Sequence, residues 1–448
     1  MQQVTPPSID ALLAALAASR ADSWEVYLRF GRELTLALRE GEIEELIVAR
    51  PQGVGVRTLW RGRLGSSFTT CLEESDAEEA VAMALEAAAA SASSFGMDFV
   101  GPAEVRDLPS LELFDPALLS LTTDDRVARL AAVERAARGA DPAVQGVREV
   151  RLKEDWQGER LVTSRGVDLA QLRSILSFQV SAVARRADDD RVGWEGASGF
   201  FWDQLPLEEL GARAGARAAA ALGAGPVPTG RYDVLFEPWP TAQLMEALGK
   251  LISIEAVRSG RSVLAGRLGQ RVFSRALTLV DDGLDPRGTG AACFDGEGTP
   301  QQTTVVAHEG ELRSFLYNRD YGRAEGRRST GNTQREDYGS PPVLGPTNLY
   351  FRPGPDGPAE LLGGLGEGLL IDEILDIDAA DSTSGAFSFG VTGRRVRNGA
   401  PAEGVTGVTI SGTLLELLDR ARAVGRDLRF FNNHGGSSLL VEGVFVAG

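Results

Sequence analysis

The first part of the chain alternates apolar and polar residues with a period of two, which is typical of half-buried strands. One face of a first run carries Trp24, Val26, Leu28 and Phe30, and one face of a second run carries Leu34, Leu36 and Leu38. Two further runs, 55–60 and 64–68, are separated by Arg61-Gly62-Arg63, which favours a tight hairpin. The sequence from Ser75 to Glu78 then predicts a capping box at the start of an alanine-rich helix that runs to about Ser93.

Helices and strands also alternate through the middle of the chain. Residues 95–120 are rich in proline, glycine and short apolar pieces, which indicates a connection between units. A helix is predicted over 124–138, and a strand is predicted around Leu176, Phe178, Val180 and Ala182. A second alanine-rich helix, 207–222, ends in the Gly/Pro-rich segment 223–228, which marks another boundary.

Beyond Arg231 the pattern changes to many short strands separated by glycine-rich turns. We predict strands over 303–306, 313–317 and 439–445, and helices over 240–257 and 412–423. The fold class is therefore α+β and multi-domain, with antiparallel sheets, packed helices and a β-rich C-terminal domain. The predicted domains are residues 1–108, 120–225 and 230–448.

The composition and charge of the chain argue against nucleic-acid binding and membrane association. The 448 residues carry a net charge of -17, which repels a nucleic-acid backbone, and no basic patch opposes it. No stretch approaches the length of about 20 apolar residues that spans a bilayer, so we expect no membrane association. The two cysteines, Cys71 and Cys293, are far apart in sequence and form no disulfide framework or CxxC pair. These features predict a cytoplasmic protein.

The chain has few residues suited to hydrolytic chemistry, since it contains only two histidines. His308 and Glu309 begin like an HExxH motif, but the fifth position is Leu312 and the segment has the glycine of a hairpin turn. His434 lies in the polar loop 430–438, where binding groups often occur. No G-x-S-x-G elbow and no phosphate-binding glycine motif is present.

The segment from Arg231 to Gly331 resembles the C-terminal domain of the TldD/PmbA family, once called modulators of DNA gyrase. In TldD-type members a strand and a Trp-Pro pair lead into a helix with an HExxxH motif, whose histidines hold zinc and whose glutamate is the general base. With Trp239-Pro240 as the anchor, the three motif positions hold Met245, Glu246 and Lys250. A thioether is a poor zinc ligand and an ammonium group repels the dication, so this helix should bind no metal. The family's cysteine ligand near the C-terminus also has no counterpart.

Other segments extend the resemblance over nearly the whole chain. Family turns and strands of the FDxEG, STGN and TNL types match 294–298, 329–332 and 346–349. The segments 404–414 and 441–448 resemble the PmbA branch, also called TldE. The resemblance therefore implies a TldD/PmbA-type C-terminal domain whose metal-site helix is degenerate.

The leading hypothesis is a non-catalytic subunit of a TldD/TldE-type zinc metallopeptidase. The resemblance implies a TldD-like HExxxH-bearing partner that supplies the zinc, although a homodimer is also open, and substrates that are unfolded or short peptides. An extended peptide would be held as an added strand. Glu246 is the one catalytic candidate, and an ancestral surface glutamate is the simpler interpretation. The candidates for a substrate or partner cleft are Trp239, Asp295, Glu297, Asn332, Asn432 and His434.

Two alternatives remain open from the sequence. The first is an autonomous metallopeptidase whose atypical metal site uses His308, His434 and carboxylates, which requires distant loops to converge. The second is a peptide-binding scaffold protein with no role in proteolysis.

Overall fold

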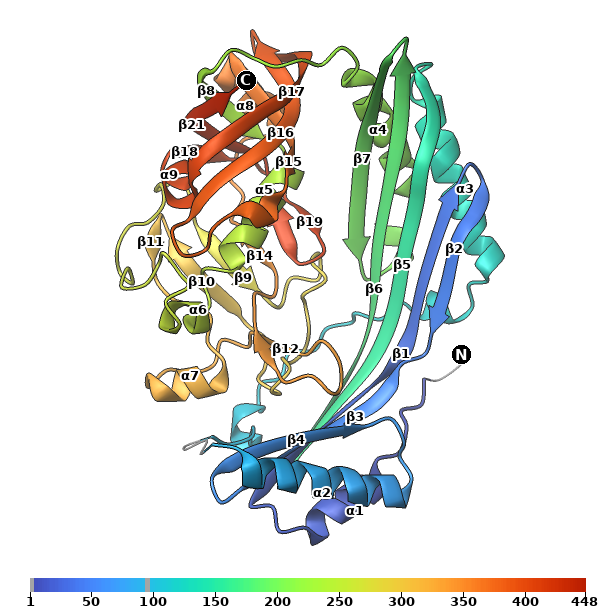
Figure 1. Cartoon of the computed structure of the whole chain (residues 1–448), viewed down its shortest axis with the longest axis vertical. Coiled ribbons are helices and arrows are strands. Elements are labelled where there is room, and N and C mark those ends of the chain that lie inside the picture. The colour runs from blue at the N-terminus through green and yellow to red at the C-terminus, as the bar shows by residue number, and fades with distance from the viewer. Residues whose placement is uncertain (1–3, 93–96) are drawn as a thin grey trace.

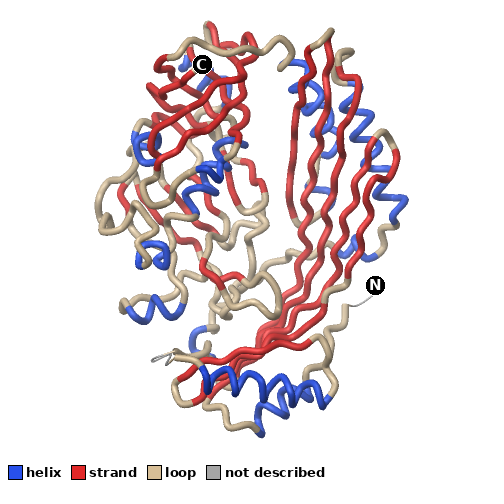
Figure 2. The backbone as a smooth tube through the Cα atoms, viewed as in Figure 1, coloured by secondary structure: helices blue, strands red, loops and turns tan. Residues whose placement is uncertain are grey.

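A long curved sheet and a compact C-terminal unit stand side by side in the computed structural model, which describes residues 4–92 and 97–448 (Figure 1). The two are joined at the lower end, where the sheet bends beneath the C-terminal unit, and by the segment that follows α4 (Figure 2). The mixture of helices and largely antiparallel sheets agrees with the predicted α+β class.

The N-terminal half is built on one seven-stranded antiparallel sheet in the order β4-β3-β1-β5-β6-β7, with β2 also paired to β1. Its strands are β1 (Ser23–Arg39), β2 (Glu42–Ala49), β3 (Gln52–Trp60), β4 (Arg63–Thr69), β5 (Val144–Thr163), β6 (Val167–Arg186) and β7 (Asp189–Gly199). The two alternating runs predicted at its start form the single strand β1. The predicted hairpin is confirmed, since Arg61 and Gly62 both have positive φ between β3 and β4.

The strand β1 connects the first two sequence segments into one sheet. Its 17 residues pair with β3 on one side near the N-terminal end and with β5 on the other side from Glu25 to Leu38. Since β5 belongs to the second predicted domain, residues 1–108 and 120–225 share a hydrogen-bonded sheet.

Helices cover one face of each part of this sheet. The helices α1 (Asp10–Ala18) and α2 (Glu74–Ala90) pack on β3 and β4, while α3 (Thr123–Gly139) and α4 (Leu207–Ala220) pack on β5, β6 and β7. The capping box predicted at Ser75 is wrong, because α2 begins at Glu74 with no side-chain cap. A capping box does occur at α3, between Thr122 and Asp125. Beneath α3, the buried Arg126 Nε donates to Glu154 Oε2 at 2.7 Å.

The C-terminal unit contains two six-stranded sheets. The first has the order β17-β16-β15-β8-β21-β18, from β8 (Gly230–Phe236), β15 (Gly368–Leu375), β16 (Ala386–Arg397), β17 (Ala400–Thr413), β18 (Ala421–Val424) and β21 (Leu439–Ala447). The second has the order β11-β10-β9-β14-β20-β19, from β9 (Leu279–Asp282), β10 (Thr303–His308), β11 (Glu311–Leu312), β14 (Leu349–Phe351), β19 (Arg429–Phe431) and β20 (His434–Gly436). Two pairs, β8 with β15 and β14 with β20, are parallel.

Short elements complete the chain. They are α5 (Pro238–Gly249), α6 (Ile254–Arg258), α7 (Arg319–Ala324), α8 (Pro358–Leu365), α9 (Leu414–Asp419), β12 (Thr333–Gln334), β13 (Val343–Leu344) and 3-10 turns at Pro102–Glu104, Pro116–Leu119, Trp202–Gln204 and Ile377–Ala379. None of the helices in the described residues is long and apolar enough to cross a membrane.

Three predicted elements of the C-terminal unit differ from the structure. The helix expected over 240–257 is two helices, because Ser253 leaves the first helix and caps α6 by accepting from Ala256 N. The helix expected over 412–423 stops at Asp419, because the next residues pair with β21. The strand expected over 313–317 is absent; only Leu316 makes a bridge, to Ser253.

Candidate functional site

Helix α5, which with its C-cap carries the three positions that the resemblance aligned with a zinc motif, lies between the two C-terminal sheets. It begins directly after β8, and Pro238 suits a first helical position because its missing N–H would have no helical partner there. The strand β20 lies against its N-terminal end at Gly436, where an added Cβ would be 1.8 Å from the carbonyl oxygen of Pro238. Glycine is therefore required for this approach, which brings the loop around His434 to the helix.

The three motif positions face different surroundings. Met245 is completely buried in the main apolar core of the C-terminal unit. Glu246 and Lys250 are partly exposed, with a carboxylate oxygen and the ammonium nitrogen 3.9 Å apart. The same ammonium lies 2.6 Å from Asp378 Oδ1. The altered positions thus form a core contact and a surface ion-pair cluster.

His434 lies beside this cluster at the start of β20, where it pairs in register with Leu349 of β14 and Phe431 of β19. Burial, with a smaller contribution from the charge of Lys250, lowers the pKa of His434 to about 4. The imidazole is therefore neutral near pH 7 and can accept or donate a hydrogen bond.

These residues do not suit a zinc ion. Zinc sites in proteins use three or four nitrogen, sulfur or oxygen ligands, whereas Met245 offers a thioether enclosed in the core and Lys250 offers a cation. Within residues 4–92 and 97–448, no group of three or more His, Cys, Asp and Glu side chains is arranged to hold a metal.

The alternative metal site from His308 and His434 is also inconsistent with the fold. His308 ends β10 and His434 begins β20, and the strands β9 and β14 lie between them in the same sheet. The three strand spacings between β10 and β20 place the backbones of the two histidines about 14 Å apart. A zinc ion bound by both residues would have to lie about 2 Å from a ring nitrogen of each. His308 instead flanks the Glu309-Gly310 turn, where both residues have positive φ, as the hairpin interpretation predicted.

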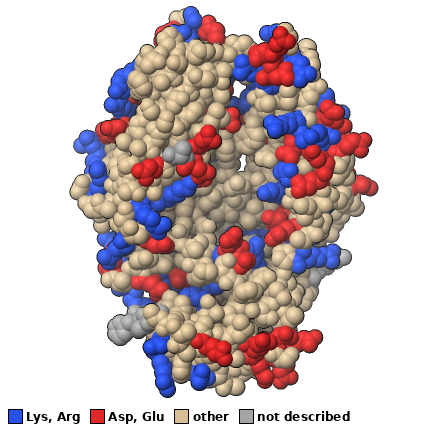
Figure 3. Space-filling model, viewed as in Figure 1, with Lys and Arg blue, Asp and Glu red and all other residues tan. Residues whose placement is uncertain are grey.

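A cavity of about 540 Å³ lies between the long sheet and the C-terminal unit. Figure 3 shows the molecular surface hollowed between these two parts, with charged groups on both sides. Trp239 of α5 lines this cavity, and its ring packs 4.7 Å from that of Trp194 and 4.9 Å from that of Phe431. The predicted cleft residue Trp239 therefore does face a cavity.

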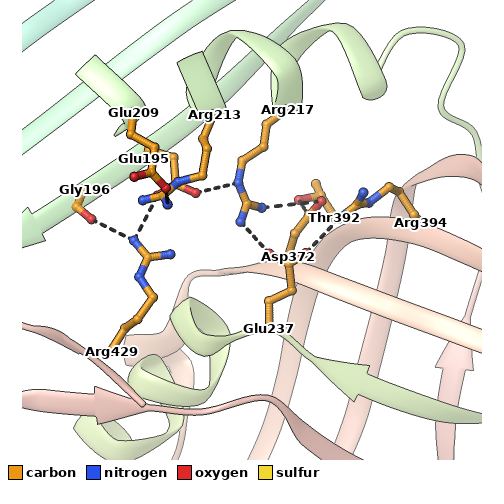
Figure 4. A network of polar contacts seen from close by, with 10 residues as sticks. All are labelled: Glu195, Gly196, Glu209, Arg213, Arg217, Glu237, Asp372, Thr392, Arg394 and Arg429. Atoms are coloured by element: carbon orange, nitrogen blue, oxygen red, sulfur yellow. Dashed lines mark hydrogen bonds and ion pairs between the residues drawn. The ribbon is translucent and has the colours of Figure 1, made fainter. Parts of the chain in front are cut away.

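Arginine side chains and carboxylates cross this cavity (Figure 4). Arg217 of α4 lies 2.8 Å from Glu195 of β7 and 2.5 Å from Glu237 at the start of α5. Glu237 also accepts from Arg394 of β16 at 2.7 Å, and Glu195 from Arg429 of β19 at 3.1 Å. Ion pairs thus connect the sheet and its helix to the C-terminal unit.

A β-bulge in β15 adds two carboxylates to the lining. The register with β16 shifts between Ile371 and Glu373, so Asp372 and Glu373 both line the cavity. Burial raises the pKa of each, and the charge of Glu237 raises that of Asp372 further. The backbone of Glu373 pairs with Thr392 of β16, whereas its carboxylate makes no hydrogen bond or ion pair among the residues that the structure describes and is influenced by the nearby charges of Asp372 and Arg217.

Asp295 and Glu297 lie elsewhere, in a buried turn. Asp295 accepts from the backbone N–H groups of Glu297, Thr299 and Thr333, so it stabilises the turn, as a turn-forming role predicts. Burial, together with the charge of Asp295, raises the pKa of Glu297 to about 7. Asp295 also borders a second cavity, of about 250 Å³, between the sheet and the C-terminal unit.

The two asparagines have structural partners. Asn332 is fully buried and its side-chain amide donates to Asp281 Oδ2 at 2.6 Å. Asn432 has positive φ, its backbone N–H donates to Ser198 Oγ, and its carbonyl accepts from Thr289 N. Asn432 therefore attaches the C-terminal loop to β7, and the six cleft candidates are distributed over separate places.

Sequence reasoning missed the charged residues that line the cavity beside Trp239. Arg217, Glu195 and Arg394 have the charged, alternating context of solvent-exposed strands and helices, and their convergence depends on how the two units face each other. The consecutive acids Asp372 and Glu373 within an apolar strand were the one available signal, because a bulge can direct neighbouring side chains to the same face.

Models of known protein families match all three parts of this architecture. Models of the PmbA/TldA metallopeptidase first domain, central domain and C-terminal domain match residues 24–92, 116–222 and 229–448. The three parts of the chain are thus those of a class of metallopeptidase-family proteins. The chain belongs to the PmbA/TldD family within that class.

Several relatives match over most of their length. A metalloprotease of Methanothermobacter thermautotrophicus is 28% identical, covering 89% of this chain and 87% of that protein. The metalloprotease PmbA of Escherichia coli O157:H7 is 23% identical, with 97% and 94% covered. A proposed modulator of DNA gyrase from Thermotoga maritima has the same structure, with a TM-score of 0.91, 28% identity and coverage of 98% and 99%. TldE of Thermococcus kodakarensis, 21% identical with a TM-score of 0.87 over 98% and 100% of the chains, has the same fold.

Proposed function

We propose that this chain is a non-catalytic subunit of a TldD/TldE-type zinc metallopeptidase. The observation that carries the proposal is the state of α5, which keeps its place between the sheets while Met245 packs in the core and the Lys250 ammonium pairs with Glu246 and Asp378. Zinc and the general base then come from a homologous partner chain that retains HExxxH. Glu246 has no metal-bound water to deprotonate in this chain.

The role left to this chain is to bind peptide substrate next to the partner's active site. The cavity supports this role, because six consecutive residues of the sheet's edge strand β7, Asp190–Glu195, line it. An edge strand offers unpaired main-chain groups, and an extended peptide can add to them with little dependence on its sequence. Aromatic rings and the Glu373 carboxylate beside this edge would provide contacts for peptide side chains.

Unfolded or short peptides are the substrate class that this arrangement favours. Strand addition requires an extended main chain, which a folded protein does not present. Residues of α4, α5, β15 and β16 also border the cavity, so a bound peptide would contact these elements as well as β7.

The test is reconstitution with each HExxxH-bearing paralogue from the same genome. We expect the paralogue to co-purify with this chain, zinc to be bound only when the paralogue is present, and an unfolded polypeptide to be cleaved only by the pair. Glutamine in place of the paralogue's motif glutamate should abolish cleavage, whereas Glu246→Gln in this chain should not.

Stoichiometric zinc and cleavage by this chain alone would contradict the proposal and favour an autonomous enzyme. A pair that binds peptides and cleaves none would favour the scaffold alternative.

A further inference from the structure

One carboxylate in the 540 Å³ cavity, that of Glu373, has no cation of its own among the described residues. Each arginine that lines the cavity is already paired with another acid. These pairs are Arg191 with Asp189, Arg213 with Glu209, Arg217 and Arg429 with Glu195, and Arg394 with Glu237. Glu373 is therefore an acid that the cations of the cavity leave over.

The neighbouring carboxylate of Asp372 makes this deficit larger. Asp372 lies 4.0 Å from Arg217 and accepts from the Thr392 hydroxyl at 3.1 Å, so it has partners of its own (Figure 4). Burial and the charge of Asp372 raise the pKa of Glu373, and the charge of Arg217 opposes them only in part. A carboxylate in such surroundings gains from a cation that brings no acid with it. The cavity therefore favours a positively charged ligand group at Glu373.

The edge strand β7 determines which face of an added peptide strand meets the cavity. Gly193 faces α4, because an added Cβ there would lie 2.2 Å from the carbonyl oxygen of Ala214. Successive side chains of a strand point to opposite faces, so Trp194 faces away from α4. Its ring lies 4.7 Å from that of Trp239 in α5. The face of β7 that carries Trp194 is thus the one that borders the cavity.

The main chain of β7 is available for pairing at the same place. The carbonyl oxygen of Gly196 accepts from Arg429 of the C-terminal unit, so it points away from β6. Main-chain groups of a strand alternate in direction, and those of Trp194 and Val192 therefore also point away from β6. These groups have no hydrogen-bond partner among the described residues. A peptide strand can pair with them directly.

We propose that Glu373 selects peptides with a lysine or arginine side chain at the position opposite Trp194. This selectivity rests on the proposed function, since it requires an extended peptide on β7. Residues opposite each other on paired strands project from the same face, so this peptide side chain enters the cavity. Its apolar stem packs along the aromatic rings that line the cavity, and its charged head binds the Glu373 carboxylate. Glu373 is then a specificity-determining residue.

Other peptide side chains fit this position less well. A peptide carboxylate would add a third acid beside Glu373 and Asp372, and the arginines near it already have acid partners. A neutral side chain fills the same space but leaves the half-buried Glu373 without a partner. Preference for basic residues and rejection of acidic ones therefore have the same cause.

Peptide binding by the full chain tests this selectivity, because residues of this chain alone line the cavity. The probes are three serine- and threonine-rich peptides with a neutral fluorophore, each N-acetylated and C-amidated, which differ only in a central lysine, norleucine or glutamate. Blocked ends remove the terminal charges, so any charge effect comes from the central side chain. By fluorescence anisotropy we expect the lysine peptide to bind roughly 10-fold more tightly than the norleucine peptide, and the glutamate peptide to bind most weakly.

Two substitutions of Glu373 separate its charge from any structural role. Glu373→Gln should weaken binding of the lysine peptide by roughly 10-fold and leave binding of the norleucine peptide unchanged, which also shows that the variant is folded. Glu373→Lys should reverse the order and favour the glutamate peptide, which a merely structural role would not produce. Glu86→Gln, at an exposed glutamate of α2, is the matched control and should bind all three peptides like the parent chain.

Two results would overturn this selectivity and leave the peptide-binding role intact: equal binding of the lysine and norleucine peptides, or a lysine preference that survives Glu373→Gln. Binding of none of the three peptides would overturn the selectivity and the peptide-binding role together. A lysine preference that Glu373→Gln abolishes, in a chain that associates with no HExxxH-bearing paralogue, would support the selectivity and contradict the proposed subunit.

Discussion

The ammonium group of Lys250 lies 2.6 Å from the Asp378 carboxylate, at the C-terminal end of α5. The same charge also lowers the pKa of His434. One side chain therefore contributes both to an exposed ion pair and to the electrostatics of a buried histidine.

Replacing Lys250 with methionine should raise the pKa of His434. Its pKa, about 4, is lowered first by burial and second by the charge of Lys250, so removing the charge should bring it part of the way back towards 6.5. Proton NMR of the two histidines measures this, with His308→Gln to assign the signals. An unchanged pKa, or a full return to 6.5, would contradict the stated causes.

The Gly436→Ala variant should be less stable than the parent chain by about 1–3 kcal/mol, because the new methyl group meets the backbone of α5 rather than a movable side chain. Urea unfolding measures the change. Gly363→Ala in helix α8 is the control, because nothing lies within 4 Å of its added Cβ, and it should be neutral or stabilising. Equal effects at both glycines would show that the contact between β20 and α5 is not tight.

Breaking the buried pair of Arg126 and Glu154 should cost about 3–5 kcal/mol of unfolding free energy, because one uncompensated group stays buried. Glu154→Gln tests this in the N-terminal half of the molecule, where both side chains are almost completely buried. Asp190→Asn breaks the exposed pair with Arg185 and should cost less than about 1 kcal/mol. Urea unfolding of the two variants under the same conditions gives the comparison.

Glu297 should make the folded state less stable as the pH rises. Its pKa is about 7 when folded, against 4.5 ordinarily, so between these values the folded chain keeps a proton that the unfolded chain has released. The free energy of unfolding therefore falls from pH 4.5 to pH 7, by up to roughly 3 kcal/mol from this group, and the loss persists above pH 7. Glu297→Gln should remove this contribution. The difference in unfolding free energy between the parent and the variant, followed from pH 4 to pH 8, measures it, and a constant difference would contradict it.

The local sequence pattern predicted the antiparallel N-terminal strands from their alternation, and it predicted the helices α2, α3 and α4 from alanine-rich runs and from residues that start or stop a helix. It failed where tertiary pairing decides the outcome. Residues 421–423 follow a helical run, yet Ala421 and Val424 pair with β21 instead. The two runs on either side of Gly31 form one strand, because β5 pairs with β1 continuously across this glycine.

The sequence predicted the altered helix through Trp239-Pro240, since those positions are adjacent along the chain. It could not predict that Trp239 faces one cavity, Asp295 a second, and His434 the ammonium of Lys250. Those relationships depend on how β7, α4 and the C-terminal sheets approach one another. The Arg217 network shows this most clearly, because its members come from positions between 195 and 429.

The pairing of β1 with β5 also has a consequence for synthesis of the chain. Roughly a hundred residues separate the two strands, so β1 emerges from the ribosome with one edge unoccupied, and β5 follows later by several seconds at about 5–20 residues per second. Contacts this distant in sequence make folding slow. The nascent N-terminal segment is therefore a natural client for chaperones that hold exposed strands.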